Sequence, residues 1–311
     1  MARVFSFHTG RPLALWERCS LQSFADHGHE ITLYAYGPLA LPKGVTLGDA
    51  STIISNDEKD LFFAGAPRMF AQFSDLFRLE MMVRHGGWWV DTDVICFSDI
   101  LPDEQIWITH VKTVQTAIMR FPPDHEFVRA AAAEARKRMR TLDPHRRTAL
   151  GPDLLKELGA SGPMQIEYIP RDSSHCFKLN GGRVGDLGEP ALAEALNQEL
   201  AACPMLHWWS EQFREINMRR DILPPRGSYL AIVFERHGGT DHMDQTDHMD
   251  LSEWRACAAK IALRRIRKRR AQRIRRLKQL MVENTRRVFG AFWPRMQPPH
   301  SGSLDGSNPP N

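Results

Sequence analysis

The sequence feature that most constrains the fold of this chain lies between residues 68 and 93, where a helix, a glycine pair and a short apolar strand follow one another. Apolar side chains recur on one helical stripe at Phe70, Phe73, Phe77 and Met81. The pair Gly86-Gly87 predicts the helix end, and the wholly apolar Trp88-Trp89-Val90 predicts a strand that is buried on both faces. Such strands belong to sheets that carry helices on both sides, so the segment favours an α/β fold.

The first 36 residues favour the same fold class. Residues 3–7 and 30–36 have the pattern of strands, and residues 13–27 have that of a helix ending at Gly28. A strand, a helix and a strand in so short a stretch predict parallel pairing. We expect further strands within 45–55, 106–119 and 166–169, and further helices at 124–140 and 152–158.

The composition is that of a folded protein. The chain has 311 residues, of which 42% are hydrophobic, enough for one large domain or two ordinary ones. No apolar run approaches the ~20 residues that cross a bilayer. The first strand has no apolar leader before it, and the five cysteines have no paired spacing, so we expect neither a secretory signal nor a disulfide framework.

The basic charge is concentrated near the C-terminus. Residues 255–295 hold 15 Lys or Arg and one acidic residue, whereas residues 1–254 hold 26 basic and 35 acidic residues. We therefore expect a main folded domain at 1–250, a basic helical tail at 251–295 and a disordered C-terminus at 296–311.

The tail has the pattern of an amphipathic helix. At 100° per residue, an arc of about 80° holds its apolar residues, interrupted by Arg270: Leu263, Ile266, Ile274, Leu277, Met281, Val288 and Phe292. A basic helix that ends in Phe292-Trp293 suits an anionic membrane surface. Docking on the acidic domain, packing in an oligomer and nucleic-acid binding are the alternatives, and nucleic acid is the least favoured because only the tail is basic.

Asp91-Thr92-Asp93 follows the apolar strand directly. On an extended segment the two carboxylates would point to the same side. The carboxyl end of a buried strand is the usual ligand edge of an α/β sheet. Because two close carboxylates repel each other, we expect them to hold a hard divalent cation together with phosphate oxygens and water.

The wider string resembles the signature of the DXD-motif glycosyltransferases, a group that includes the catalytic domains of the large clostridial toxins. Its elements stand here in order: Ser74-Asp75, then Arg78, then Gly86-Gly87, an aromatic residue and Asp91-Thr92-Asp93. Thr148 with Gly151-Pro152 looks like the family's threonine and Gly-Pro turn. The segment 206–210 looks like its C-terminal His/Trp/Ser motif, although the spacing differs.

The resemblance implies a GT-A (Rossmann-like nucleotide-sugar transferase) fold, to which this chain adds a C-terminal basic helical extension. It also implies a UDP- or GDP-sugar donor, Mn²⁺ or Mg²⁺, and transfer with retention to a glycan, lipid-linked or polysaccharide acceptor. Asp93 would hold the metal, and Asp91 would bind the metal or the donor ribose. Asp75 and Arg78 share a helix face and would bind the sugar or the diphosphate; the alternative is a surface salt bridge.

Other candidate residues come from the two ends of the domain. His207 would be a third metal ligand or a diphosphate contact. Trp208 or Trp209 would cover the donor, with core packing as the alternative. Phe7, His8 and Thr9, at the end of the first strand, would receive the nucleotide base. We expect a bacterial enzyme of polysaccharide biosynthesis that is cytoplasmic or peripheral at the inner face of the membrane.

Two other functions remain open on the sequence alone. A haloacid-dehalogenase-like phosphatase also has an Asp-x-Asp motif after an apolar strand, but on its first strand and with a later acidic pair. A non-catalytic membrane-surface adaptor with a degenerate transferase body is the second alternative. The repeated pentamer at 240–244 and 246–250 is interpreted as a linker.

Overall fold

The computed structural model describes residues 1–9, 11–65, 69–110, 114–139, 146–161, 183–238 and 247–292. The chain divides into two compact units, Met1–Ile261 and Ala262–Asn311. Within the described ranges no helix has both the length and the hydropathy needed to cross a membrane. The strand predicted at 166–169, the first pentamer of the repeat and residues 293–311 lie outside the described residues.

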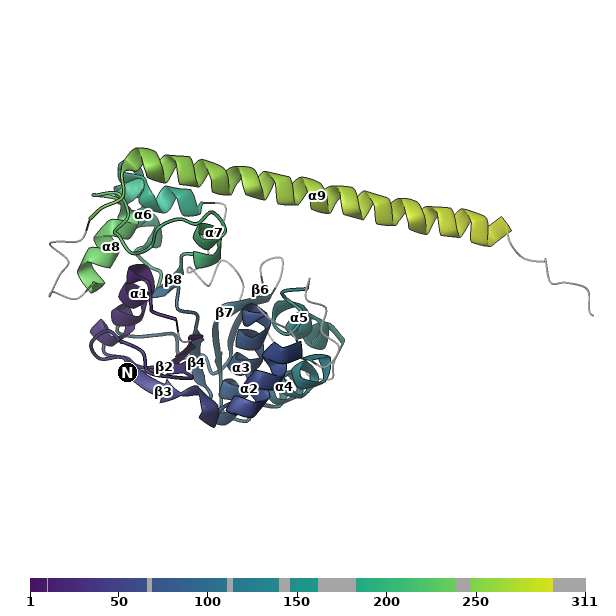
Figure 1. Ribbon diagram of the computed structural model, residues 1–311, viewed down its shortest axis with the longest axis horizontal. Helices are drawn as coiled ribbons and strands as arrows, with labels where there is room; N and C mark the ends of the chain where they lie inside the picture. The colour runs from purple at the N-terminus through teal and green to yellow at the C-terminus, as the bar shows by residue number, and fades with distance from the viewer. Residues whose placement is uncertain are drawn as a thin grey trace, which may run out of the picture. The chain divides into compact units, whose positions relative to one another are not determined.

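A sheet of six strands forms the centre of the first unit, in the order β3-β2-β1-β4-β7-β6 (Figure 1). Its strands are β1 (Arg3–Phe7), β2 (Glu30–Ala35), β3 (Thr46–Asp49), β4 (Gly87–Val90), β6 (Trp107–His110) and β7 (Val114–Phe121). Strands β3, β2, β1 and β4 are parallel, and β7 and β6 continue the sheet in antiparallel fashion. The α/β prediction is confirmed, and the mixed sheet is consistent with a GT-A fold.

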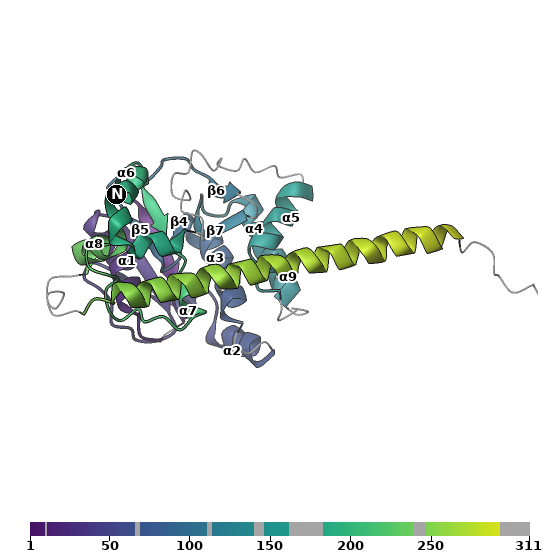
Figure 2. The same cartoon turned by 90° about the horizontal axis from the view of Figure 1, so that it is seen from above.

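Helices cover both faces of this sheet (Figure 1). One face packs against α1 (Leu15–Asp26), and the other packs against α2 (Asn56–Gly65), α3 (Phe70–His85), α4 (Glu126–Met139) and α5 (Pro152–Ser161). Helices α3 and α4 lie side by side (Figure 2). Trp88 and Trp89 contribute to the cores on opposite faces, so β4 is buried on both sides, as its sequence predicts.

The end of α3 also follows the prediction. Gly86 caps the helix with φ +58°, and Gly87 follows with φ +79°, a backbone region that glycine adopts without strain. Phe73, Phe77 and Met81 are buried, but Phe70 is 50% exposed and packs on Phe63 instead. The apolar stripe is therefore buried except at Phe70, which lies in the first turn of the helix.

A third core lies around the indole rings of Trp16, Trp208 and Trp254, which are fully buried. It joins α1 to the C-terminal elements α6 (Ala193–Leu200), α7 (Ser210–Arg214) and α8 (Tyr229–His237), and to the two short strands β5 (Val94–Cys96) and β8 (Met205–His207). The 3-10 turns are η1 (Ala50–Thr52), η3 (Val184–Gly188) and η4 (Pro190–Leu192). Distant parts of the sequence are thereby fixed around one aromatic cluster.

Helix α9 spans Leu251–Phe292. Its first turns bury Trp254, Cys257 and Ile261 in the third core, so these turns belong to the first unit. The indole Nε1 of Trp254 donates a hydrogen bond to the carbonyl of Gly185 at 2.8 Å. The boundary between the compact units therefore follows Ile261, about three turns after the boundary expected from the change in charge.

Candidate active site

The strand order reverses between β1 and β4. The chain passes from β1 to β2 on one side, and β4 pairs with the other side of β1. In open α/β sheets, ligands bind at the carboxyl ends of the strands at such a switch point. Phe5 pairs with Trp89 in parallel register, so the carboxyl ends of the two strands, at Phe7 and at Val90, lie at the same edge of the sheet. Asp91 follows β4 at this edge.

A cleft of about 950 Å³ opens at the switch point. Residues from both ends of the first unit line it. They include all but one of the site residues expected from the sequence, namely Phe7, His8, Thr9, Asp75, Arg78, Asp91, Asp93 and His207. The exception is Trp208. A cleft of this size accommodates a ligand as large as a nucleotide sugar.

The Asp-x-Asp triplet forms a turn, which corrects the expectation of an extended segment. The amide of Val94 donates to the carbonyl of Asp91 at 3.1 Å and closes this turn. The amide of Asp91 still donates to the carbonyl of Ala117 on β7, at 2.8 Å, so the turn begins directly at the sheet edge. Both carboxylates reach the cleft, but each has its own set of partners.

Arg78 links two of the acidic residues. Its Nη1 donates to Asp75 Oδ1 at 2.6 Å and its Nη2 donates to Asp91 Oδ1 at 2.7 Å. The guanidinium lies over the Trp89 ring, whose Nε1 also donates to Asp91 at 2.8 Å. Asp75 and Arg78 are buried, so the surface salt bridge considered as the alternative does not describe them. Burial raises the pKa of Asp75 to about 7, against the opposing charge of Arg78.

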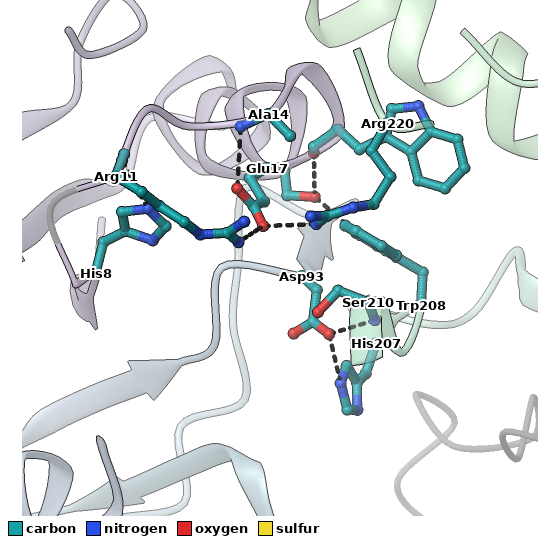
Figure 3. Close-up of polar contacts among 11 residues, drawn as sticks. His8, Arg11, Ala14, Glu17, Asp93, His207, Trp208, Ser210 and Arg220 are labelled. Carbon is teal, nitrogen blue, oxygen red and sulfur yellow. Dashed lines mark hydrogen bonds and ion pairs between the residues drawn. The ribbon is translucent and has the colours of Figure 1, made fainter. Parts of the chain in front are cut away.

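Asp93 is held by the C-terminal part of the unit. Strand β8 pairs with β5 so that His207 lies opposite Val94, next to Asp93. His207 Nε2 lies 3.1 Å from Asp93 Oδ2, and the amide of Ser210 donates to the same oxygen at 2.7 Å (Figure 3). A strand pairing across more than a hundred residues therefore places His207 beside the Asp-x-Asp turn.

Asp93 and His207, which are both buried, shift each other's pKa. Burial by itself would raise the pKa of Asp93 and lower that of His207. Their mutual attraction and hydrogen bond outweigh burial, so the pKa of Asp93 is lowered and the pKa of His207 is raised. Each partner therefore favours the charged form of the other. The Nδ1 atom of His207 is buried and has no hydrogen-bond partner among the described residues.

The prediction that Trp208 binds the donor is wrong. Trp208 is fully buried in the third core, where its Nε1 donates to the hydroxyl of Ser20 at 2.8 Å. The neighbouring Trp209 lines the cleft instead, with its ring stacked on His207 at a centroid distance of 4.3 Å. Trp209 has φ +63°, an uncommon conformation for a bulky residue. This backbone turn directs consecutive tryptophans to the core and to the cleft.

An unpredicted charged cluster borders the cleft beside His8 and Thr9. The Glu17 carboxylate accepts from Arg11 Nη2 at 2.8 Å and from Arg220 Nη1 at 2.7 Å, and its second oxygen accepts from the amide of Ala14 at 3.0 Å. Figure 3 shows the two arginines approaching Glu17 from opposite sides. Glu17 is almost fully buried. The cluster fixes the loop between β1 and α1 to the segment that follows α7.

The carboxylates of Asp91 and Asp93 suit a divalent ion, but the metal site of Asp91, Asp93 and His207 that the sequence predicts does not assemble. Among the described residues, no three His, Cys, Asp or Glu side chains converge to hold a metal ion. His207 Nε2 faces Asp93 rather than a shared ion position. The contacts of Asp91 and Asp93 each use one carboxylate oxygen, and the remaining two oxygens are hard ligands. Mg²⁺ and Mn²⁺ are suited to such a pair when substrate oxygens complete the coordination shell.

Gly151 controls the position of Asp75. A Cβ atom at residue 151 would overlap the Asp75 carboxylate, which is short, buried and tied to Arg78. We expect Gly151→Ala to displace Asp75 and to reduce turnover at this cleft by about a hundredfold, the cost of a misplacement near 1 Å. Steady-state turnover of the donor expected from the sequence resemblance measures this effect.

Gly37→Ala is the matched control, because a Cβ there meets open space. It should leave turnover unchanged. Wild-type turnover in a folded Gly151→Ala variant, with circular dichroism to verify the fold, would mean that the position of Asp75 does not matter.

Residues 22–113 match the family described as "Glycosyltransferase sugar-binding region containing DXD motif". The matched range includes α3, β4 and the Asp-x-Asp turn. The chain is also similar to a solved structure described as "PaToxG Glycosyltransferase", with 14% sequence identity, a TM-score of 0.39, and coverage of 64% of this chain and 78% of that chain. No curated protein matches the chain. The predicted resemblance to DXD glycosyltransferases is confirmed by the family match.

Proposed function

We propose that this DXD-type glycosyltransferase moves a hexose from a UDP- or GDP-sugar to a glycan, lipid-linked or polysaccharide acceptor, with Mn²⁺ or Mg²⁺ bound at the Asp-x-Asp turn. The observation that carries the proposal is that both aspartates reach one cleft at the switch point of the sheet, together with Arg78 and His207. Retention at the anomeric carbon is part of the proposal and follows from the family resemblance.

The donor sugar would lie against Asp75 and Arg78. A carboxylate accepts hydrogen bonds from sugar hydroxyls, and a guanidinium donates in a fixed fork. Because Arg78 binds Asp75 and Asp91 at the same time, it would also keep the sugar site in register with the turn. Lysine carries its donors on one nitrogen and lacks the two separate Nη atoms that make these contacts in a fixed geometry.

The metal would be held by the oxygens of Asp91 and Asp93 that face no described partner. When bound, it supplies Lewis-acid stabilisation of the departing nucleoside diphosphate. Asp91 would in addition accept from a ribose hydroxyl. Phe7, His8 and Thr9, at the end of β1, would receive the nucleotide base on the other side of the cleft.

His207 would contact the diphosphate rather than the metal. Asp93 favours the charged form of the imidazole and orients the ring, and in that form the unpartnered Nδ1 would donate to a phosphate oxygen. Trp209 would work beside it, since its Nε1 is also buried without a described partner. Such preorganised donors stabilise charge that develops on a leaving group.

A phosphatase of the haloacid dehalogenase type is not favoured. Its motif stands on the first strand of the fold, whereas Asp91 follows β4 after the β1-α1-β2 unit. One Asp91 oxygen already accepts from both Arg78 and Trp89, so the nucleophile and the metal ligand of such a phosphatase would have to share the other oxygen. The family match also favours sugar transfer over the non-catalytic adaptor.

A donor screen tests the proposal directly. The purified full chain is incubated with UDP- and GDP-sugars, and released nucleoside diphosphate is measured. We expect release from at least one donor in the presence of Mn²⁺ or Mg²⁺ and its loss, by about a hundredfold or more, when EDTA removes the metal. Restored activity on adding excess metal back is the control for damage by the chelator. Undiminished release in EDTA would contradict the metal-dependent mechanism.

The proposed place of the reaction is the inner face of a membrane, where lipid-linked acceptors would be reached by a peripheral protein. The basic helix is the part of the chain that suits such a position, because it combines positive charge with apolar side chains.

A further inference from the structure

Helix α9 carries an exposed apolar stripe beyond the part that packs in the third core. From Ala262 onward, five apolar side chains of this stripe are at least 48% exposed, namely Leu263 (49%), Ile266 (48%), Ile274 (54%), Leu277 (52%) and Met281 (69%). At 100° per residue they share an arc of about 80°. We call these five residues the α9 stripe. The side chains of Val288 and Phe292, and all of Trp293, lie outside the described part of the chain.

Basic residues flank the α9 stripe on both sides. Between residues 262 and 285 the sequence has ten Lys or Arg and one acidic residue, Glu283. On the helical wheel, Arg267 and Lys278 border one side of the stripe, Arg273 borders the other, and Arg270 lies within it. Long basic side chains at these positions can extend their charged ends away from an apolar surface while their stems remain on it.

The combination of an exposed apolar stripe with basic flanks limits which kind of partner the helix can bind. If two copies of the helix paired, each copy would contribute ten positive charges to the contact. Their repulsion opposes self-association. A nucleic acid would satisfy the basic residues but offers no continuous apolar surface to the exposed leucine and isoleucine side chains. An anionic lipid surface satisfies both, because acyl chains take up the stripe and phosphate groups face the flanking bases.

We propose that residues 262–285 are a docking helix for the surface of an anionic phospholipid bilayer, with the α9 stripe lying in the interface. The helix lies in the plane of the membrane surface and does not cross it. Attachment depends on two features together. The α9 stripe inserts into the interface, and the basic residues on its flanks give selectivity for anionic headgroups.

The test is co-sedimentation of the full chain with vesicles. We compare phosphatidylcholine vesicles with vesicles in which roughly a third of the lipid is phosphatidylserine. We expect binding to the anionic vesicles to be at least roughly tenfold tighter and to weaken as salt is raised. Equal binding to both kinds of vesicle, or binding to neither, would overturn the proposal.

A pair of charge-matched variants separates membrane docking from simple charge attraction. Ile274→Glu/Met281→Glu adds two acidic residues within the α9 stripe. Gln272→Glu/Gln279→Glu adds two acidic residues seven positions apart on the opposite face of the helix. We expect the stripe variant to bind anionic vesicles at least roughly tenfold more weakly than the opposite-face variant, because only its new carboxylates would have to enter the lipid interface. Equal losses in the two variants would overturn the role of the stripe.

Binding of the same proteins to duplex RNA or DNA is measured in parallel. Tighter binding to nucleic acid than to anionic vesicles, with equal effects of the two variants, would assign the helix to nucleic acid instead. Circular dichroism verifies that α9 remains helical in both variants.

The inference is independent of the proposed sugar transfer. Asp93→Asn, which alters the cleft, should bind anionic vesicles as the wild type does. The stripe variant should release nucleoside diphosphate from a soluble donor at the wild-type rate. A protein without any donor activity would therefore still report on docking.

Discussion

Replacing Asp93 by asparagine should abolish both donor hydrolysis and sugar transfer, with a loss of about a thousandfold in turnover. The side chain keeps its size but loses the negative charge that would hold the cation and keep His207 charged. Two contributions to leaving-group stabilisation therefore disappear in one variant. Turnover of the donor identified in the screen, at saturating metal, measures the effect.

The matched control is Asp99→Asn. Its carboxylate is 81% exposed, pairs with His27 and does not line the cleft. This variant makes the same chemical change and should leave turnover unchanged. If Asp93→Asn kept more than about a tenth of wild-type turnover, metal-assisted departure at this turn would be untenable.

The stability of the Asp93 variant should depend on pH in a defined way. The lowered pKa of Asp93 gives stability that is present above the unfolded pKa of ~3.9 and is lost as pH falls. The raised pKa of His207 gives stability that is full below the unfolded pKa of ~6.5 and is lost as pH rises through the folded value. The free energy of unfolding should therefore differ most between the wild type and the variant from about pH 4 to 6.5. Urea unfolding across this range measures the difference.

Replacing Gly188 by alanine should destabilise the first unit by about 3 kcal/mol. A Cβ at residue 188 would overlap the indole ring of Trp254, which is fully buried in the third core. The ring has little freedom to move, because its Nε1 is bonded to the Gly185 carbonyl and it packs on Trp16 and Phe213. Urea unfolding followed by tryptophan fluorescence measures the loss.

Two further variants make this prediction specific. Gly65→Ala lies at the end of α2, where a Cβ meets open space, so it should not destabilise the protein. Trp254→Phe reduces the ring and should lessen the added cost of Gly188→Ala, as a double-mutant cycle would reveal. If the effects of Gly188→Ala and Trp254→Phe on the free energy of unfolding were purely additive, overlap between the new Cβ and the indole ring would be excluded as the cause of the destabilisation.

The local elements of this fold could be predicted from the sequence because their signals are local. The apolar stripe of α3, the glycine pair and the apolar strand β4 lie within 25 residues and determine where Asp91 stands. The basic helix after residue 250 was equally visible from periodicity and charge. The exposure of Phe70 could not be predicted, because periodicity does not reveal which end of a helix extends beyond the core.

The parts that could not be predicted depend on contacts between distant residues. Glu17 and Arg220 are 203 positions apart, and no local pattern joins them. Trp208 and Trp209 are adjacent, and only the left-handed backbone of Trp209 decides which ring enters the cleft. The pairing of Asp93 with His207 follows from strand pairing between β5 and β8, which the sequence did not indicate.

The pairing of β5 with β8 has a consequence for synthesis. The Asp-x-Asp turn leaves the ribosome more than a hundred residues before His207 and Ser210, the groups that hold Asp93 in place. A nascent or prematurely terminated chain would carry the acidic turn without its imidazolium partner. We therefore expect unfinished polypeptides to be unable to consume donor, so that the activity appears only after residue 210 has left the ribosome.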